Sequence, residues 1–157
     1  MTRVLYPGSF DPIHYGHLEI IETVSQIFGQ VVVAAMFNPQ KNEVLFSLDE
    51  RKRIIVEACA HIPNVSVAVS EGLVVDLAKK LEADFIVKGL RAVSDFEREL
   101  QMAQMNFALS GIHTTFIPSA SRHSFLASKL IREVTRLGGD VSPMVPEAVM
   151  RHLPKTS

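Results

Sequence analysis

Two histidines that follow a short apolar segment are the residues of this chain best placed to do chemistry. The segment 7–17 reads PGSFDPIHYGH, so glycine and proline set an irregular backbone around His14 and His17. The two rings are three residues apart, and at the entry of a helix they can point to one side. Free N–H groups at a helix start bind phosphate, and Gly16 lets the backbone approach a ligand closely. The segment therefore predicts a loop that holds a phosphate chain beside two imidazoles.

His17 is the stronger candidate of the pair. Its ring N–H can donate to a phosphate oxygen, and phosphoryl and nucleotidyl transfers depend mainly on positioning and charge neutralisation. Helix capping is the alternative role. The two imidazoles without a third protein ligand do not predict a metal site.

Cations and hydroxyls supply further candidates. Lys88 and Arg91 flank Gly89 after an apolar run, an arrangement typical of a phosphate clamp, although solvated surface cations are the alternative. Lys41 lies in a loop that contains proline, and Ser128 lies in a segment rich in hydroxyls and cations. Ser128 could donate to phosphate, but N-capping by a serine of that segment is the more ordinary explanation.

Alternating strand and helix patterns must position these residues. Strands are predicted at 3–6, 31–36, 65–69, 85–87 and 114–117, and helices at 18–28, 48–60, 73–82, 94–109 and 126–137, with a short last helix after Pro146. Gly29 is expected to end the first helix, and Ser47 with Glu50 and Ser94 with Glu97 have the form of capping boxes. The alternation predicts one α/β domain over residues 1–157, a five-stranded parallel sheet with helices on both faces.

The candidate residues follow the ends of predicted strands. Residues 9–17 follow the first, Lys41 the second, 88–91 the fourth and 119–128 the fifth. Because open α/β sheets bind ligands outside the carboxyl ends of their strands, we expect these residues to converge on one crevice.

Composition narrows the class of protein. The chain has 157 residues, a net charge of -1 and no basic block, so binding to nucleic acid through a charged surface is not expected. No apolar run approaches the length of a membrane span, and the N-terminus does not read as a signal peptide. One cysteine, Cys59, excludes an intrachain disulfide and fits a reducing compartment. We expect a cytoplasmic protein.

Three segments carry a resemblance to a known family. YPGSFDPIHYGH at 6–17, KGLRAVSDFE at 88–97 and SFLASKLIREV at 124–134 are similar to the bacterial phosphopantetheine adenylyltransferases, members of the HxGH nucleotidyltransferase superfamily. The first segment is shared by the superfamily, and the second is more specific to this family. The resemblance implies a Rossmann-like fold and transfer of AMP from ATP to 4'-phosphopantetheine with Mg²⁺, giving dephospho-coenzyme A and pyrophosphate. It also implies a homohexamer.

The resemblance assigns roles to particular residues. It implies His17, Lys41 and Arg91 as catalytic residues. It implies ATP contacts from Ser9, Phe10, His14, His17, Gly89, Leu90, Arg91, Glu99, His123, Ser124, Ser128 and Lys129, and acceptor contacts from Ser9, Lys41, Val74 and Lys88. The chain departs from the family in Lys88, where arginine is usual, in Ala127, where many members have serine, and in His123, where some have tryptophan. His14 stands where members often have threonine.

A phosphate acceptor is already an anionic nucleophile, so this reaction needs alignment and charge screening but no general base. Another acceptor, such as a different phosphomonoester or nicotinamide mononucleotide, is an alternative within the superfamily. A sensor that binds ATP without turnover and a purely structural assembly protein are alternatives of other classes.

Overall fold

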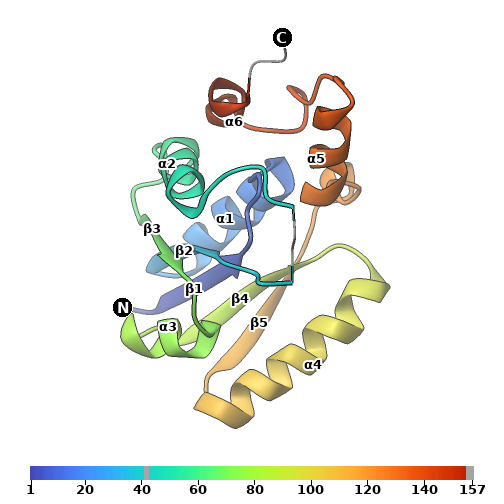
Figure 1. Ribbon diagram of the computed structural model, residues 1–157. Coiled ribbons are helices and arrows are strands. Elements are labelled where there is room, and N and C mark those ends of the chain that lie inside the picture. Colours follow the sequence, from blue (N-terminus) through green and yellow to red (C-terminus); the bar gives the residue numbers. More distant parts are fainter. Residues whose placement is uncertain (41–42, 155–157) are drawn as a thin grey trace.

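The computed structural model describes residues 1–40 and 43–154 and shows one parallel sheet between two layers of helices (Figure 1). The strands are β1 (Arg3–Gly8), β2 (Gln30–Met36), β3 (Val65–Ser70), β4 (Phe85–Leu90) and β5 (His113–Pro118), in the spatial order β3-β2-β1-β4-β5. All neighbouring pairs are parallel. This confirms the predicted α/β fold, a doubly wound sheet of five strands.

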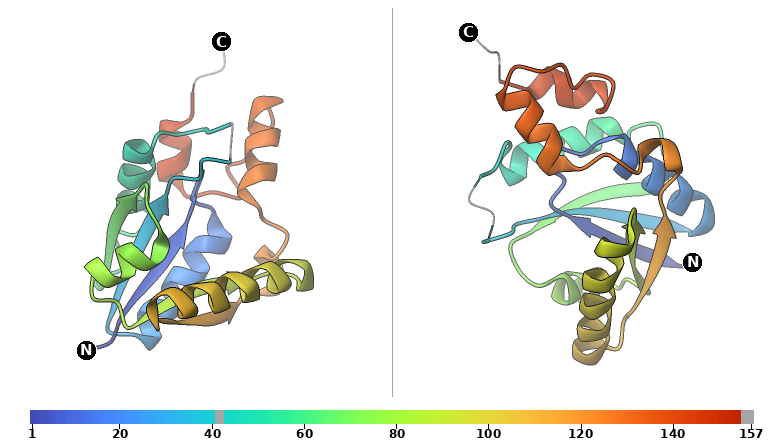
Figure 2. Two further views of the ribbon diagram at one scale, coloured as in Figure 1. Left: turned by 60° about the horizontal axis from the view of Figure 1, so that its bottom comes forward. Right: turned by 90° about the vertical axis from the view of Figure 1, so that its right-hand side faces the viewer.

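Helices cover both faces of the sheet. They are α1 (Tyr15–Ile27), α2 (Leu48–Ala58), α3 (Val74–Lys80), α4 (Val93–Ser110), α5 (Ser128–Arg136) and α6 (Glu147–His152), with a 3-10 turn η1 at Ser121–His123. Apolar side chains of α1, α2 and α6 form one core with alternate residues of β1 and β2, and those of α3 form a second core on the opposite face. Figure 2 shows α4 on the same side as α3, away from α1 and α2. No helix within the described residues is long and apolar enough to span a membrane.

Strand order creates the crevice that the sequence predicted. From β1 the chain proceeds outward through β2 to β3, and then returns to the other side of β1 with β4 and β5. The connections at the carboxyl ends of β1 and β4 therefore leave in opposite directions, which opens a ligand-binding crevice between them.

Several predicted boundaries are wrong, each for a local reason. The first helix begins at Tyr15, three residues before the expected start, because His14 caps it, and Phe28 in extended conformation ends it before Gly29. Helix α4 begins at Val93 with Ala92 at its N-cap, so Ser94 lies inside the helix and is not its N-cap residue. Ser47 does cap α2, accepting the backbone N–H of Glu50.

A buried carboxylate ties the loop after β1 to the rest of the fold. Asp11 is 2% exposed, and its two carboxylate oxygens accept the backbone N–H groups of Leu45 and Phe46, both at 2.8 Å. Arg51 donates to the carbonyls of Phe46 at 3.1 Å and Ser9 at 2.9 Å, and Arg132 donates to the Asp11 carbonyl at 2.7 Å. Burial lowers the pKa of Arg51, and the charge of Asp11 opposes that shift. These bonds hold β1, α2 and α5 around the crevice.

Replacement of Asp11 with alanine should lower the free energy of unfolding by about 2 to 4 kcal/mol, because two N–H groups lose their acceptor and a buried guanidinium loses its counter-charge. Urea unfolding followed by circular dichroism measures this. Asp76→Ala, on the exposed surface of α3, is the control and should change stability by less than about 0.5 kcal/mol. Equal stability of the two variants would show that the Asp11 bonds contribute nothing net.

Candidate active site

Two adjoining cavities open at the carboxyl ends of β1 and β4. Their volumes are about 510 Å³ and 730 Å³. Seven residues line both: Pro7, Gly8, Ser9, Lys88, Asp95, Arg98 and Glu99. We call the place where these seven residues lie the junction. The larger cavity extends from it along Met36, Ile86, Met102 and Thr114, and the smaller one along His14, His17, Arg91 and Ser128.

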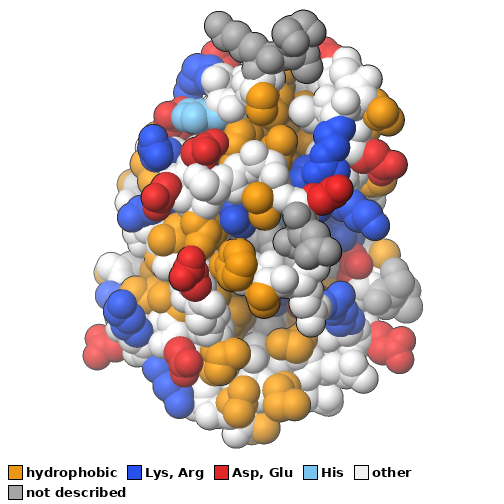
Figure 3. All heavy atoms as spheres, in the orientation of Figure 1, with side chains coloured by type: hydrophobic (Ala, Val, Ile, Leu, Met, Phe, Trp, Pro, Cys, Tyr) orange, Lys and Arg blue, Asp and Glu red, His pale blue; other side chains and the backbone are white. Residues whose placement is uncertain are grey.

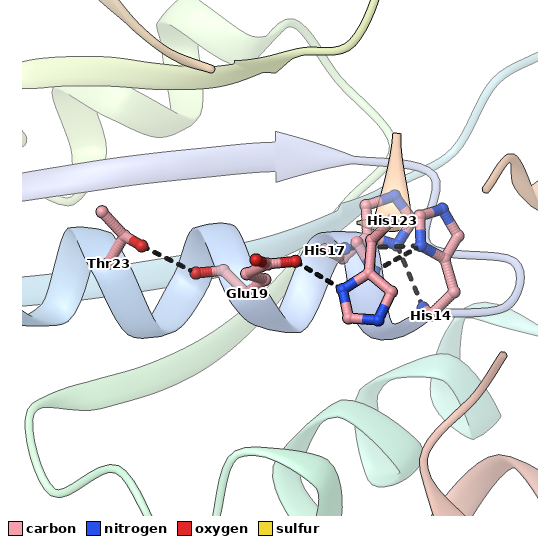
Figure 4. A network of polar contacts seen from close by, with 6 residues as sticks. His14, His17, Glu19, Thr23 and His123 are labelled. Carbon is pink, nitrogen blue, oxygen red and sulfur yellow. Dashed lines mark hydrogen bonds and ion pairs between the residues drawn. The ribbon is translucent and has the colours of Figure 1, made fainter. Parts of the chain in front are cut away.

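The entry of α1 holds both histidines of the sequence motif. Nδ1 of His14 accepts the backbone N–H groups of Gly16 at 3.0 Å and His17 at 3.4 Å, while Nδ1 of His17 accepts the N–H of His14 at 3.2 Å. The two rings stack with centroids 3.7 Å apart (Figure 4). Because each Nδ1 accepts a backbone N–H, both neutral rings carry their proton on Nε2. His17, which lines the smaller cavity, therefore has an Nε2–H donor whose orientation the helix entry fixes.

His14 is a helix cap held in the neutral form. Burial lowers the pKa of His14 to about 4, and the positive charges of Arg91 and His123 add to the effect. Protonation would also place a proton on the Nδ1 atom that accepts two backbone N–H groups. His14 also lines the smaller cavity, so its ring both caps the helix and forms part of the cavity wall.

Carboxylates on α4 pair with the two cations of the predicted phosphate clamp. Nζ of Lys88 lies 3.6 Å from a carboxylate oxygen of Glu99, and Nε of Arg91 lies 3.3 Å from Asp95. Arg91 also donates to the carbonyl of Leu126 at 2.5 Å. The clamp residues, predicted from β4 alone, are thus held in place by α4 and the segment before α5. Gly89 lies between them and lines the smaller cavity.

The start of α5 contributes a hydroxyl and a cation. Ser128 Oγ donates to the carbonyl of Pro12 at 2.8 Å, and Ala127 occupies the N-cap position without a side-chain cap bond. The capping explanation for this segment is therefore wrong, and Ser128 and Lys129 both line the smaller cavity. Phe10, with φ of 48°, packs edge-on against the His17 ring at 4.8 Å between centroids.

Three described residues of the predicted site do not line the cavities, and a fourth predicted residue lies outside the described part of the chain. His123 pairs with Glu19 of α1 through Nδ1 at 2.5 Å and stacks on Tyr15, as Figure 4 shows for the pair with Glu19. Leu90, Ser124 and His123 are absent from the described lining of both cavities, and Lys41 lies outside the described residues. Contacts of these four with ligand stay predictions. Val74 does line the larger cavity.

Sequence reasoning missed two arginines that line the crevice. Arg98 lies at the junction, and Arg132, 7% exposed, lines the smaller cavity. Helical spacing could have found Arg132, because it is four residues after Ser128 on the same helix face. No predicted site residue lies three or four positions from Arg98, so spacing gave no signal for it.

The sheet is open and parallel, and cations line the crevice at its topological switch point. An imidazole donor lies at the adjoining helix entry. This combination is typical of nucleotide-binding α/β enzymes. Within that class the family is shown by sequence: residues 5–134 match the cytidylyltransferase-like family, and the chain belongs to it. Membership supports a nucleotidyltransferase activity. The fold is also similar to the crystal structure of the lipopolysaccharide core biosynthesis protein from Thermoplasma volcanium GSS1, at 21% identity and a TM-score of 0.57, over 76% of this chain and 97% of that one.

The low pKa of His14 predicts a loss of stability as pH falls from about 6.5 to about 4. In this window the unfolded state binds a proton at the histidine and the folded state does not, so the free energy of unfolding decreases with decreasing pH, by roughly 3 kcal/mol in total for this group. Threonine can cap a helix without titrating, so His14→Thr should flatten the dependence. Urea unfolding at pH 4.5 to 7.5 measures it.

The surface residue His61 provides the control, since His61→Ala should leave the pH dependence of the wild type in place. An identical slope for His14→Thr and the wild type would contradict the proposed neutral cap.

Proposed function

We propose that this protein is an adenylyltransferase that transfers AMP from ATP to 4'-phosphopantetheine, giving dephospho-coenzyme A and pyrophosphate. The observation that carries the proposal is the junction: there a cation-rich cavity meets a second cavity whose described lining beyond the junction is uncharged, and Ser9 and Lys88 line both. Such a pair suits a triphosphate on one side and, on the other, an acceptor with a phosphate head and an uncharged chain. The segment KGLRAVSDFE, which contains Lys88, supports phosphopantetheine over other acceptors.

The smaller cavity suits the triphosphate. Arg91, Lys129 and Arg132 line it together with the Nε2–H donor of His17. Charge-assisted hydrogen bonds from such groups bind phosphate strongly, and they can follow the charge that develops on the leaving pyrophosphate.

The larger cavity suits the chain of the acceptor. Its walls are mostly apolar, with Val74, Ile86 and Met102 among them, and Asn106 and Thr114 add polar groups. Thr114 Oγ1 is buried without a hydrogen-bond partner in the described part of the chain. A chain that alternates methylene and amide groups fits this combination. We also propose that Lys41 contacts the acceptor, on the resemblance alone.

The reaction follows from alignment of two anions. An oxygen of the acceptor phosphate attacks the α-phosphorus of ATP; a new P–O bond forms, and the bond to the bridging oxygen breaks as pyrophosphate leaves. The nucleophile is already ionised, so no side chain has to remove a proton. Lys88 holds the nucleophile, while Arg91 neutralises charge on the triphosphate and the Nε2–H of His17 donates a hydrogen bond to it. The two mutually repelling anions are thereby aligned.

Magnesium fits this site as a partner of the triphosphate. The described residues contain no cluster of three or more candidate metal ligands, but the carboxylates of Asp95 and Glu99 line the smaller cavity. One or two carboxylates plus substrate phosphates are the usual environment of Mg²⁺. The bound ion would neutralise phosphate charge.

Pyrophosphate release from ATP tests the proposal directly. The purified protein is assayed with 4'-phosphopantetheine and, in parallel, with glycerol 3-phosphate, nicotinamide mononucleotide and no acceptor. Turnover with 4'-phosphopantetheine at least tenfold faster than with the others is expected. Faster turnover with another acceptor, or with CTP in place of ATP, would replace the proposed substrates, and binding of ATP without turnover would indicate a sensor.

His17→Ala should lower turnover by roughly 10²- to 10³-fold, the range for loss of one transition-state donor, while the dissociation constant of ATP changes far less. Steady-state kinetics and calorimetry with ATP alone measure the two effects. His61→Ala, which removes a surface histidine, serves as the control. Weaker ATP binding with unchanged turnover would show that His17 acts only in ground-state binding.

We also propose a homohexamer. Helix α4 exposes apolar side chains that a monomer would leave in water: Phe96, Leu100, Met102, Met105, Phe107 and Leu109. Figure 3 shows hydrophobic side chains on the lower part of the molecule, where α3 and α4 lie. Light scattering should give about six times the 17.4 kDa mass of the chain. Leu109→Glu should lower that mass, and a wild-type mass near 17.4 kDa at micromolar concentration would contradict the proposal.

A further inference from the structure

We propose that Arg98 binds the phosphate of the acceptor together with Lys88. The inference rests on the proposed transfer to a phosphate acceptor. It adds a residue that the sequence motifs did not indicate.

The distribution of charge along the crevice places the acceptor phosphate. Within the described residues, the part of the larger cavity beyond the junction is lined by uncharged side chains alone: Met36, Phe37, Asn38, Pro39, Val74, Ile86, Met102, Ala103, Asn106 and Thr114. Its two cations, Lys88 and Arg98, lie at the junction. An anion deeper in this cavity would lose water without gaining a counter-charge from the described residues, at a high cost in free energy. The phosphate therefore lies at Lys88 and Arg98, and an uncharged chain lies beyond it.

Ion pairing distinguishes the two cations. Lys88 lies 3.6 Å from Glu99, so part of its charge is already neutralised inside the protein. The guanidinium of Arg98 has no carboxylate within ion-pair distance among the described residues, although Asp95 and Glu99 lie on the same helix face. Arg98 therefore offers the junction a cation that needs no exchange of partners when an anion binds.

The chemistry of the two side chains is complementary. Lys88 supplies a compact point charge, whereas the planar fork of Arg98 can donate two parallel hydrogen bonds to a phosphate. Lys88 approaches the junction from β4 and Arg98 from α4, the two elements that flank it. An anion between them is held from both sides. This fixes the direction in which it attacks the α-phosphorus of ATP in the smaller cavity.

The decisive experiment compares phosphorylated and unphosphorylated ligands. Calorimetry measures binding of 4'-phosphopantetheine, pantetheine and ATP, each alone, to the wild type and to Arg98→Gln. Loss of a hydrogen bond to a charged group should weaken the binding of 4'-phosphopantetheine by about 10- to 100-fold. Binding of pantetheine and of ATP should change less than about twofold, because pantetheine has no phosphate and Arg91, Lys129 and Arg132 hold the triphosphate of ATP. A merely structural role of Arg98 would weaken the binding of all three ligands.

Two variants complete the test. Arg98→Lys keeps the charge without the fork and should restore part of the affinity, and Lys80→Gln removes one cation from the exposed surface of α3 as a control for net charge. Equal affinity of the wild type and Arg98→Gln for 4'-phosphopantetheine, in a wild type that turns it over, would overturn the role of Arg98 and leave the proposed function intact. A wild type without turnover of 4'-phosphopantetheine would overturn the proposed acceptor instead.

Discussion

The buried carboxylate of Asp11 is the interaction on which the site depends. A charge with 2% exposure is stable only when hydrogen bonds and counter-charges surround it, and here two backbone N–H groups and the nearby Arg51 do so. Because those partners come from the segment before α2 and from α2 itself, the loop after β1 cannot move without breaking them. Ser9 and His17, on either side of Asp11, are thereby held at the crevice.

The entry of α1 uses one histidine to orient another. A cap residue must offer an acceptor to free N–H groups, and the neutral ring of His14 does this with Nδ1. In the opposite direction, the backbone N–H of His14 donates to Nδ1 of His17. This hydrogen bond fixes the orientation and the tautomer of the second ring. A histidine whose proton position is set by the backbone needs no reorganisation when charge develops on a phosphate, which is the condition for effective electrostatic stabilisation.

The cations of the crevice are balanced by acids on α4. Pairs between Lys88 and Glu99 and between Arg91 and Asp95 reduce the repulsion that several close positive charges would otherwise cause. Each side chain in these pairs is about a quarter to a third exposed, so water screens the pairs and an incoming phosphate can exchange with the carboxylate. The ion pairs therefore stabilise the cations of the crevice and still let them bind an anion.

The sequence by itself determined the succession of strands and helices, but not the last residue of each strand: β4 was predicted to end at residue 87 and runs to Leu90, so Lys88 and Gly89 lie within it. Continuous apolar runs and helical spacing are local signals, so β2, α2 and the HYGH segment could be predicted before any contact was known. The family motif also lies in such a local segment, because the candidate phosphate-binding residues are close in sequence to the strand ends.

Only the tertiary structure decided which of these residues meet. Ser128 bonds to the carbonyl of Pro12, 116 residues away in the chain, and His123 turns toward Glu19 instead of the cavities. Arg98 lines the crevice because α4 packs beside β4 and β5, and no pattern in the sequence gives the order of the strands. Packing between elements distant in the chain selects one arrangement of strands and helices among many. Local propensity carries no information about which arrangement forms.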